Sequence, residues 1–205
     1  LLAAELNAKL AREAIDVTLP ARPESTGALH PITATSNQLI SILSHLGFQL
    51  VDGPELEDDE HNFDSLNIPP LHPARLMHDT FYLDSNVSGA TLLRTHTSNV
   101  QIRAMRGLKP PFRLMSVGRV YRCDDDQTHT PMFHQFEGIA VGEAVTMAEL
   151  RYTLSMLINE FFGVGEVPMR FRPSFFPFTE PSAEVDIACR RKGNEITIGA
   201  GDQWL

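Results

Sequence analysis

The chain has 205 residues, 17 basic against 26 acidic side chains, a net charge of −9 and 42% hydrophobic residues. This length and composition suit one sizeable domain, or one and a fraction, with enough residues to bury a core. The acidic balance argues against a general nucleic-acid-binding face, since phosphate contacts need clustered Lys and Arg. Two cysteines, Cys123 and Cys189, form neither a disulfide framework nor a metal-binding spacing, so a reduced, cytoplasmic setting is the default. The sequence contains no apolar run of membrane-spanning length and no signal peptide, so we expect no membrane partner.

The first residues carry a helical pattern. Leu2, Leu6 and Leu10 recur every four residues with charged side chains opposite them, which predicts an amphipathic helix and could be the end of a coiled coil. Residues 1–19 are therefore expected to be helical. The stretch 20–31 is rich in proline and reads as a linker.

A second helix is expected from about Ser36, as its cap, to Leu46, with a short strand over residues 48–51 after it. The acidic run at 55–60 is interpreted as a solvated helix face. Strands around a turn at 88–89 are expected over residues 79–84 and 91–95. Three histidines in this region fit no zinc spacing and are not interpreted as a metal site: His61, His72 and His78.

A helix is next expected from Ser98 to about Gly107. Ser98 and Gln101 have the spacing of a capping box, in which each side chain accepts from or donates to the backbone of the first turn. Polar groups at a helix start can equally face a ligand. Both interpretations stay open at this point.

The stretch 117–141 predicts two strands around a polar loop. Because side chains alternate along a strand, Phe133, Gln135 and Glu137 share one face, while Arg122 comes from the neighbouring strand. A flat ring suits adenine, an arginine suits phosphate, and the amide and carboxylate suit an ammonium group. The alternative is the solvated face of an ordinary antiparallel sheet.

Residues 146–163 predict a helix, with a capping box formed by Thr146 and Glu149 and with Gly163 at its end. Its apolar face would be buried scaffold, formed by Leu150, Leu154, Leu157, Ile158 and Phe161.

In the stretch 170–187, three prolines exclude a central, fully paired strand, so this segment should lie at a sheet edge or around a cavity. Phe176 and Phe178 would point the same way and could clamp a third ring, although Phe in an ordinary core is the commoner arrangement. A hairpin turning at residues 192–194 should follow.

Together, GRVYR, the loop residues Thr128-His129 and FHQFEG resemble the second signature motif of class II aminoacyl-tRNA synthetases. The amino-acid sequences of these segments, and of FRPSFFPFTEPSAE, are similar to those of the alpha subunits of bacterial-type phenylalanine–tRNA ligases. The likeness extends over nearly the whole chain and is strongest at 94–103, 117–141 and 170–187. It implies an α+β fold with an antiparallel sheet flanked by helices. It also implies a helical, tRNA-binding arm ending within 1–19 and a catalytic domain over 32–205 that stops before the third class II motif.

The resemblance further implies ATP-dependent activation of phenylalanine and its transfer to tRNA(Phe). It gives Arg122 the catalytic role of stabilising the α-phosphate, and it gives Glu180 the role of magnesium ligand. The implied ATP-binding residues are Arg122, Asp124, His129 and Phe133. The implied phenylalanine-binding residues are His96, Ser98, Gln101, Gln135, Glu137, Phe176 and Phe178.

The family also implies a beta subunit, in an assembly of two alpha and two beta subunits, as the partner that supplies further tRNA contacts. We therefore expect residues 1–205 alone to be inactive. Two alternatives remain: a non-catalytic module of class II type that binds an amino acid or adenylate, and a ligase for another bulky amino acid. Retention of Arg122, Glu137 and both ring residues favours the catalytic interpretation.

Overall fold

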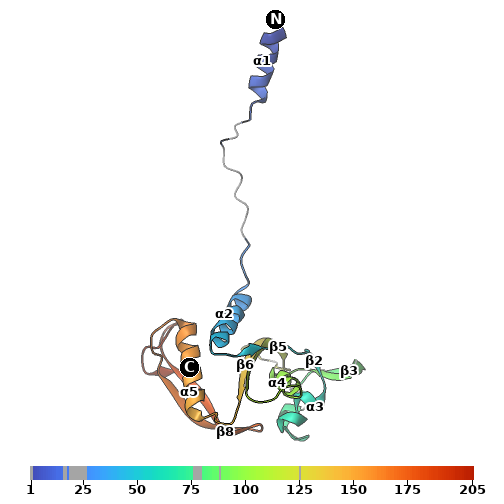
Figure 1. Cartoon of the computed structure of the whole chain (residues 1–205), viewed down its shortest axis with the longest axis vertical. Helices are drawn as coiled ribbons and strands as arrows, with labels where there is room; N and C mark the ends of the chain where they lie inside the picture. Colours follow the sequence, from blue (N-terminus) through green and yellow to red (C-terminus); the bar gives the residue numbers. More distant parts are fainter. Residues whose placement is uncertain (1, 16–17, 19–26, 76–79, 88, 125) are drawn as a thin grey trace. The chain divides into compact units, whose positions relative to one another are not determined.

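The structure is a computed structural model that describes residues 2–15, 18, 27–75, 80–87, 89–124 and 126–205 (Figure 1). It divides into two compact units, residues 1–30 and residues 31–205. Residues 20–26 of the expected linker lie outside the described residues, and residues 27–30 have no regular secondary structure.

Among its described residues, the first unit contains one helix, α1 (Leu2–Glu13). Its stripe of Leu2, Leu6 and Leu10 is exposed, and Lys9 lies 3.9 Å from Glu13 one turn later. The predicted amphipathic helix is confirmed over residues 2–13, and its apolar face is uncovered within this unit. Its expected continuation to residue 19 is not: residues 14–15 have no regular secondary structure, and 16–17 and 19 lie outside the described residues.

The second unit combines helices with short and long strands. Its helices are α2 (Pro31–His45), α3 (Asp59–Asn62), α4 (Ser98–Met105) and α5 (Met147–Phe162), with 3-10 turns η1 (Asp64–Leu66) and η2 (Pro73–Arg75). Its strands are β1 (Gln49–Leu50), β2 (Leu56–Glu57), β3 (Tyr82–Val87), β4 (Ala90–Leu93), β5 (Phe112–Tyr121), β6 (Met132–Val141), β7 (Met169–Phe176), β8 (Thr179–Lys192), β9 (Glu195–Ile198) and β10 (Gln203–Trp204).

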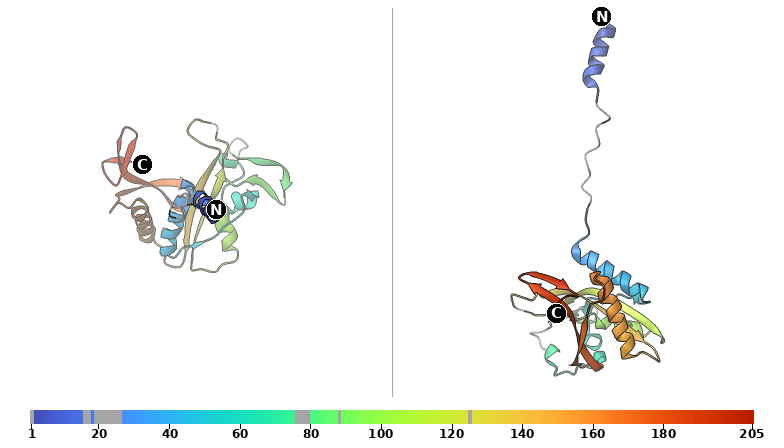
Figure 2. Two further views of the ribbon diagram at one scale, coloured as in Figure 1. Left: turned by 90° about the horizontal axis from the view of Figure 1, so that it is seen from above. Right: turned by 90° about the vertical axis from the view of Figure 1, so that its left-hand side faces the viewer.

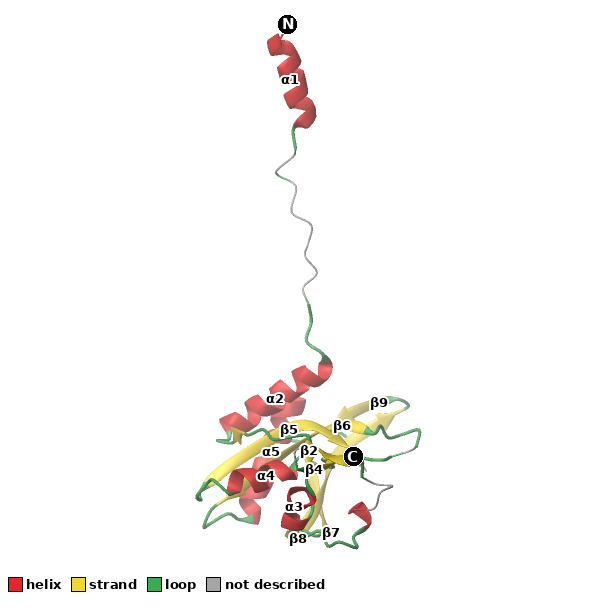
Figure 3. Ribbon diagram, turned by 90° about the vertical axis from the view of Figure 1, so that its right-hand side faces the viewer, coloured by secondary structure: helices red, strands yellow, loops and turns green. Residues whose placement is uncertain are grey.

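The long antiparallel ladder of β5 and β6 divides this unit, with β1 added in parallel on the other edge of β5. Helix α2 lies on one side of the ladder and α4 on the other (Figures 2 and 3). Paired residues in an antiparallel ladder share a face, so Glu137 opposite Ser116 and Gln135 opposite Gly118 belong to one face. Phe136 opposite Val117 belongs to the other. The predicted α+β fold with an antiparallel sheet flanked by helices is confirmed.

The face of β5 that carries Met115 packs against α2 and α5. Its buried core cluster consists of Ile42, Leu43, Phe48, Met115 and Leu157. The prediction that α2 begins at Ser36 is wrong, because the helix starts five residues earlier at Pro31, a residue whose fixed φ suits a first helical turn. Ser36 therefore lies inside the helix and cannot cap it.

Two further sheets lie in the described part of the unit. Strands β2, β4 and β3 cover a second core cluster of Phe63, Leu66, Ile68 and Leu92. Strands β10, β8 and β7 form another sheet, with β9 also paired to β8. Pro173 lies in the edge strand β7, Pro177 in the hairpin turn, and Pro181 beside a register shift, as expected for a segment that cannot be fully paired. The turn at 193–194 between β8 and β9 is confirmed.

The interpretation of residues 55–60 as a solvated helix face is wrong. Glu57 belongs to β2, is 1% exposed, and accepts hydrogen bonds from Arg103 and from Asn99 Nδ2 at 2.6 Å. These partners lower the pKa of Glu57 against the opposing effect of burial, which is the largest influence. Helix α3 begins within this acidic run, at Asp59, and the Asp58 side chain caps it. Of the expected strand and turn residues nearby, Asp79 and Ser88 lie outside the described residues, as does His78.

Helix α5 begins with the predicted capping box, in which Glu149 N donates to Thr146 Oγ1 at 3.3 Å and Thr146 N donates to Glu149 Oε2 at 3.0 Å. Gly163 ends the helix in the left-handed conformation, also as predicted. Leu150 differs from its prediction, since it is 47% exposed rather than buried.

We expect Thr146→Ala to lower the free energy of unfolding by about 1 kcal/mol, because one cap acceptor is lost. Chemical denaturation of this variant beside Thr146→Ser, which keeps the hydroxyl, measures the effect. Equal loss in both variants would contradict a role for the hydroxyl oxygen.

In the part of the chain that the structure describes, helices of sufficient length and apolarity to cross a bilayer are absent.

Candidate active site

A cavity of about 520 Å³ opens on the face of β6 that carries Gln135 and Glu137. It lies between this strand, the start of α4 and the tip of the β7–β8 hairpin. Its lining residues are Phe63, Ile68, His72, Thr95, His96, Ser98, Arg122, Asp124, Gln135, Glu137, Phe176, Pro177 and Phe178. Eight of the residues singled out from the sequence therefore meet around one cavity: His96, Ser98, Arg122, Asp124, Gln135, Glu137, Phe176 and Phe178.

The β5–β6 ladder positions the polar floor of this cavity. Burial alternates along β6, with Phe133, Gln135 and Glu137 more covered than the residues between them, so the predicted shared face is confirmed. The Arg122 guanidinium lies over the Phe133 ring, with Cζ 5.0 Å from the ring centroid. One face of the ring assigned to adenine is therefore already covered by the arginine.

Glu137 is the centre of a hydrogen-bond network. Ser98 Oγ donates to its Oε1 at 2.7 Å, Gln135 Nε2 donates to the same oxygen at 3.1 Å, and Gln101 Nε2 lies 3.5 Å from Oε2. Helix α4 has Thr97 at its cap position without a side-chain capping bond. Of the two interpretations left open for Ser98 and Gln101, the capping box does not form, because both side chains turn to the carboxylate instead.

The electrostatics of this network favour a cationic ligand. Burial raises the pKa of Glu137, with the Ser98 and Thr97 hydroxyls and the Arg94 charge opposing it. Gln135 Oε1 is buried and has no hydrogen-bond partner among the described residues. A buried carboxylate beside an unpaired carbonyl oxygen offers two acceptors, which is what an ammonium group needs.

Arg94 lies directly beneath this floor. The side chain is 2% exposed, and its Nε donates to Arg119 O at 2.8 Å while Nη1 donates to Gly53 O at 3.1 Å. The next residue, Thr95, accepts from Arg122 Nε at 3.1 Å. The two residues that follow β4, Arg94 and Thr95, therefore support the floor and hold Arg122 in place. Sequence reasoning missed Arg94, because nothing local distinguishes it from a surface arginine.

Gly118 makes room for Arg94. It faces the cavity side of β5, and a Cβ placed there would overlap Arg94 Nη2. We expect Gly118→Ala to displace the guanidinium and to cost about 1.5–3 kcal/mol of stability, the usual contribution of a hydrogen bond to a charged group.

Thermal denaturation of Gly118→Ala measures this cost, and Gly165→Ala is the matched control because a Cβ there meets nothing within 4 Å. A Gly118→Ala protein as stable as the control would show that Arg94 moves freely. A partial rescue by the double variant with Arg94→Lys would support the proposed overlap.

Phe176 ends β7, Phe178 lies in the hairpin turn, and both line the cavity. Their ring centroids are 6.3 Å apart with an interplanar angle of 34°. Phe63, which is fully buried, and Ile68 form the apolar wall across from them. These four side chains form an aromatic slot beside the polar floor, and they come from segments as far apart in the sequence as residues 63 and 178.

Four other residues singled out from the sequence do not line the cavity: His129, Gln101, Phe133 and Glu180. His129 lies in the exposed loop, where its Nδ1 contacts Asp126 Oδ2 at 2.6 Å, and this contact raises the pKa of His129. Gln101 reaches the site only through Glu137, and Phe133 only beneath Arg122. His96 does line the cavity, and burial lowers its pKa to about 4, so its ring is neutral at pH 7.

Glu180 lies one step further along the hairpin tip, in a recess that shares Ile68, His72, Phe176, Pro177 and Phe178 with the cavity. Its carboxylate is exposed and has no ion pair or hydrogen bond within the described chain. A single free carboxylate fits magnesium, which usually takes one or two carboxylates together with substrate phosphates. Among the described residues, Glu57, Asp58 and His61 also cluster, but Arg103 and Asn99 already occupy the Glu57 oxygens.

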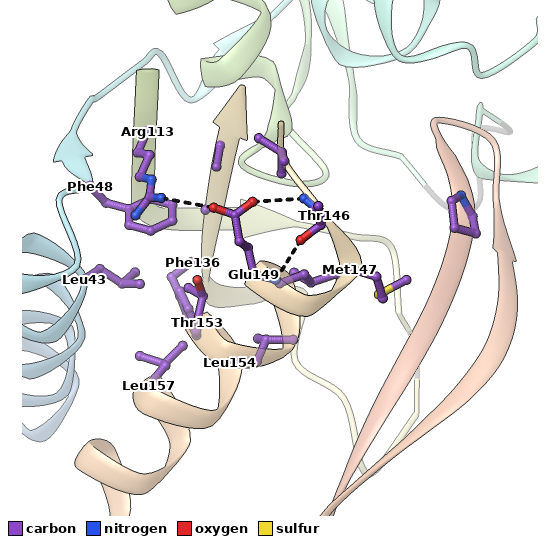
Figure 4. Close-up of a pocket in the computed structure, with 15 residues that line it drawn as sticks. Leu43, Phe48, Arg113, Phe136, Thr146, Met147, Glu149, Thr153, Leu154 and Leu157 are labelled. Atoms are coloured by element: carbon purple, nitrogen blue, oxygen red, sulfur yellow. Dashed lines mark hydrogen bonds and ion pairs between the residues drawn. The ribbon is translucent and has the colours of Figure 1, made fainter. Parts of the chain in front are cut away.

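A second cavity, of about 390 Å³, lies on the opposite face of β6 (Figure 4). Phe136, Leu43 and Leu154 give it apolar walls, and Glu149 lies at its edge between Thr146 and Arg113. Its side chains offer no nucleophile or convergent set of acceptors, so the chemistry is assigned to the other face.

Residues 14–205 match the family described as the tRNA synthetases class II core domain (F). The match includes both faces of the β5–β6 ladder and all the residues around the cavity. The chain therefore belongs to this family of class II synthetase core domains.

Three individual relatives are similar to the chain over most or all of its length. The phenylalanine–tRNA ligase alpha subunit of Rhodospirillum rubrum is 58% identical over the whole chain, and that of Thioalkalivibrio sulfidiphilus is 57% identical. The corresponding subunit of Rhodospirillum centenum is 56% identical over 96% of the chain. The chain spans 58%, 60% and 55% of these three proteins, respectively.

Among solved structures, two of pyrrolysyl-tRNA synthetase from Desulfitobacterium hafniense have TM-scores of 0.57 and 0.56. They share 16% and 18% sequence identity with the chain, and cover 90% and 94% of it and 59% and 62% of their own chains. At this identity the likeness supports the class II fold alone.

Proposed function

We propose that the chain is the catalytic core of a phenylalanine–tRNA ligase alpha subunit, which activates phenylalanine with ATP and transfers it to tRNA(Phe). The observation that carries the proposal is one cavity with an aromatic slot, an ammonium-accepting floor and an arginine at its edge. Each of these three features matches one part of the substrates: the phenyl ring, the amino group and the α-phosphate.

In the activation step, the phenylalanine carboxylate oxygen attacks the α-phosphorus of ATP. A bond forms between them, the bond to the bridging oxygen breaks, and pyrophosphate leaves with that oxygen. The substrate supplies its own nucleophile, so the protein contributes positioning and charge stabilisation. Glu137 and Gln135 hold the ammonium group, Phe176 and Phe178 hold the ring, and Arg122 stabilises charge on the α-phosphate.

The nucleotide has fewer contacts in this assignment. Phe133 offers a ring for adenine once Arg122 turns from it toward phosphate, and Asp124 lies at the cavity edge. His129 lies in the loop and not in the cavity, so it would contact the nucleotide from the loop side. Glu180 would hold magnesium, which neutralises phosphate charge when bound.

The partners follow from the same proposal. Relatives named as alpha subunits indicate a second kind of subunit, and we propose a beta subunit in an assembly of two alpha and two beta chains. Because the net charge is −9, this core can make few contacts to the tRNA phosphates itself. Most tRNA contacts therefore come from the beta subunit and from the helical arm to which α1 belongs. We place the whole protein in the cytoplasm.

The test is ATP–pyrophosphate exchange by the full-length protein with its partner subunit, measured with each amino acid in turn. We expect exchange with phenylalanine, a weaker signal with tyrosine because an apolar pocket rejects one added hydroxyl by only about 10²-fold, and loss of exchange on magnesium chelation. Exchange with a different bulky amino acid would favour another ligase. Binding without any exchange would favour the non-catalytic module.

A further inference from the structure

The tip of the β7–β8 hairpin carries both slot phenylalanines, yet it projects from its own sheet. The turn is only Pro177 and Phe178, and Phe175 beside it is 79% exposed. Within the hairpin, Ser182 Oγ donates to Thr179 O at 2.8 Å, which shapes the turn but does not fix it to the rest of the unit. The position of the two rings over the cavity therefore depends on contacts made across to another element.

Asn67 makes such a contact. Its Nδ2 donates to Pro177 O at 2.7 Å, across 110 positions of sequence. The acceptor is the carbonyl between the two slot phenylalanines, so the bond acts at the centre of the turn. This distance is at the short end of the range for N–H···O hydrogen bonds in proteins.

The backbone that presents Asn67 is unusual and firmly anchored. Asn67 has φ 58° and ψ 30°, and it is the only non-glycine residue with positive φ in the described chain. Asparagine tolerates this left-handed conformation better than most residues, and here it ends η1 while aiming its amide at the hairpin. On either side, Leu66 and Ile68 are 5% and 6% exposed and belong to the second core cluster.

The anchoring extends to a cation. Arg75 Nη1 donates to Ile68 O at 3.2 Å and its Nη2 donates to Asp64 Oδ1 at 2.8 Å, while its guanidinium lies over the Phe63 ring. One wall of the slot, formed by Phe63 and Ile68, and the donor that holds the other wall thus belong to a single rigid segment. The Asn67 bond sets the distance between the two walls.

We propose that Asn67 is a positioning residue that holds the hairpin tip over the cavity and thereby sets the affinity of the aromatic slot for a phenyl side chain. The inference rests on the proposed function for the identity of the ligand, but the Asn67–Pro177 connection does not. Asn67 acts through the backbone of Pro177 and touches no reacting atom. It lines the same recess as Glu180, which follows Pro177 by three residues on the hairpin, so nucleotide binding is compared without magnesium.

The decisive variant is Asn67→Gly, because glycine keeps the left-handed backbone without strain and removes only the side-chain donor. Asn67→Asp keeps the shape but places a carboxylate oxygen against the Pro177 carbonyl. Ser65→Gly, in the same 3-10 turn, is the matched control for added backbone freedom. All three are made in the full-length protein.

Two readouts separate this inference from the proposed function. Hydrogen exchange of the amides at 175, 176, 178 and 179 should rise in Asn67→Gly and Asn67→Asp and stay unchanged in Ser65→Gly. Calorimetry should show phenylalanine affinity weakened about threefold to tenfold in the first two variants, as expected for one lost hydrogen bond, with the affinity for magnesium-free ATP unchanged.

Unchanged hydrogen exchange at the tip would overturn the proposal that Asn67 holds the hairpin, whatever the ligand proves to be. Faster exchange with unchanged phenylalanine affinity would overturn the effect on the slot. If the parent protein binds no phenylalanine, the proposed function fails, and the exchange measurement still decides whether Asn67 holds the hairpin.

Discussion

Replacing Arg122 by alanine should slow phenylalanine-dependent pyrophosphate exchange by about 10²–10³-fold, the usual effect of removing one donor that stabilises charge in a transition state. The guanidinium lies at the edge of the cavity, held by Thr95 O and stacked on Phe133, where it can turn to a phosphate without leaving the site. Phenylalanine binding should persist, because the aromatic slot and the Glu137 network do not contain Arg122.

The effect should be in kcat and in the KM for ATP. Loss of Arg122 also uncovers the Phe133 ring, so the two contributions are separated by adding Arg122→Lys, which keeps a positive charge and loses the planar fork. Arg119→Ala is the matched control: it removes an arginine three residues earlier whose own side chain is exposed and pairs with the half-buried Glu55, and exposed pairs contribute about 0–1 kcal/mol. Near-normal exchange by Arg122→Ala would refute the assignment.

The parts of the site that could be predicted from sequence are those set by short-range geometry. The alternation of a strand places Phe133, Gln135 and Glu137 on one face irrespective of what surrounds the strand. Prolines 173, 177 and 181 restrict pairing wherever they occur, which kept the aromatic hairpin at an edge. The capping box of α5 similarly involves atoms only three residues apart.

Where one local pattern fits two structures, the outcome depends on distant residues. Ser98 and Gln101 have the spacing of a capping box, and the chain nevertheless turns both side chains toward Glu137, nearly forty positions away. Glu57 stands in an acidic run typical of a solvated surface, but within the fold Arg103 balances its charge and Asn99 donates a hydrogen bond to it. In each case a long-range partner overrides the local preference, and a single sequence carries no record of that partner.

Some residues of the site give no sequence signal. Arg94 is an arginine next to two leucines at the end of a short strand, and its burial depends on a glycine at position 118 in another strand. Asn67 precedes a proline-rich loop and resembles any turn residue until its 2.7 Å bond to the hairpin is seen. Both act by supporting residues that do have recognisable patterns, which is why the supporting layer appears only in three dimensions.

Glu137→Gln should separate ligand binding from stability, because the carboxylate proposed to bind the ammonium group is costly to bury. Burial raises the pKa of Glu137 above its usual value, so the folded protein binds that proton more tightly than the unfolded chain does. The stabilising effect of the bound proton is complete below the unfolded pKa and is lost as pH rises through the folded pKa. At pH 7 the ionised group therefore weakens the unliganded fold, and a neutral glutamine removes that cost.

We accordingly expect Glu137→Gln to unfold at a higher temperature than the parent protein at pH 7 without ligand, with the difference vanishing as the pH falls below the ordinary range for a carboxyl group. Phenylalanine affinity should fall by at least about 30-fold, since removing one partner of a buried charge pair costs about 2–5 kcal/mol. Glu143→Gln, at an exposed position just after β6, should change neither quantity.

Calorimetry and thermal denaturation across pH decide between the two roles that Glu137 could have. A variant that is both less stable and unable to bind would make Glu137 a structural anchor for Ser98 and Gln101. A variant that is more stable and unable to bind would mean that the Glu137 charge destabilises the unliganded fold. That charge would then be balanced only when the ammonium group of the ligand binds. The unpaired Gln135 Oε1 next to the carboxylate favours the second result, since an ammonium group satisfies both acceptors at once.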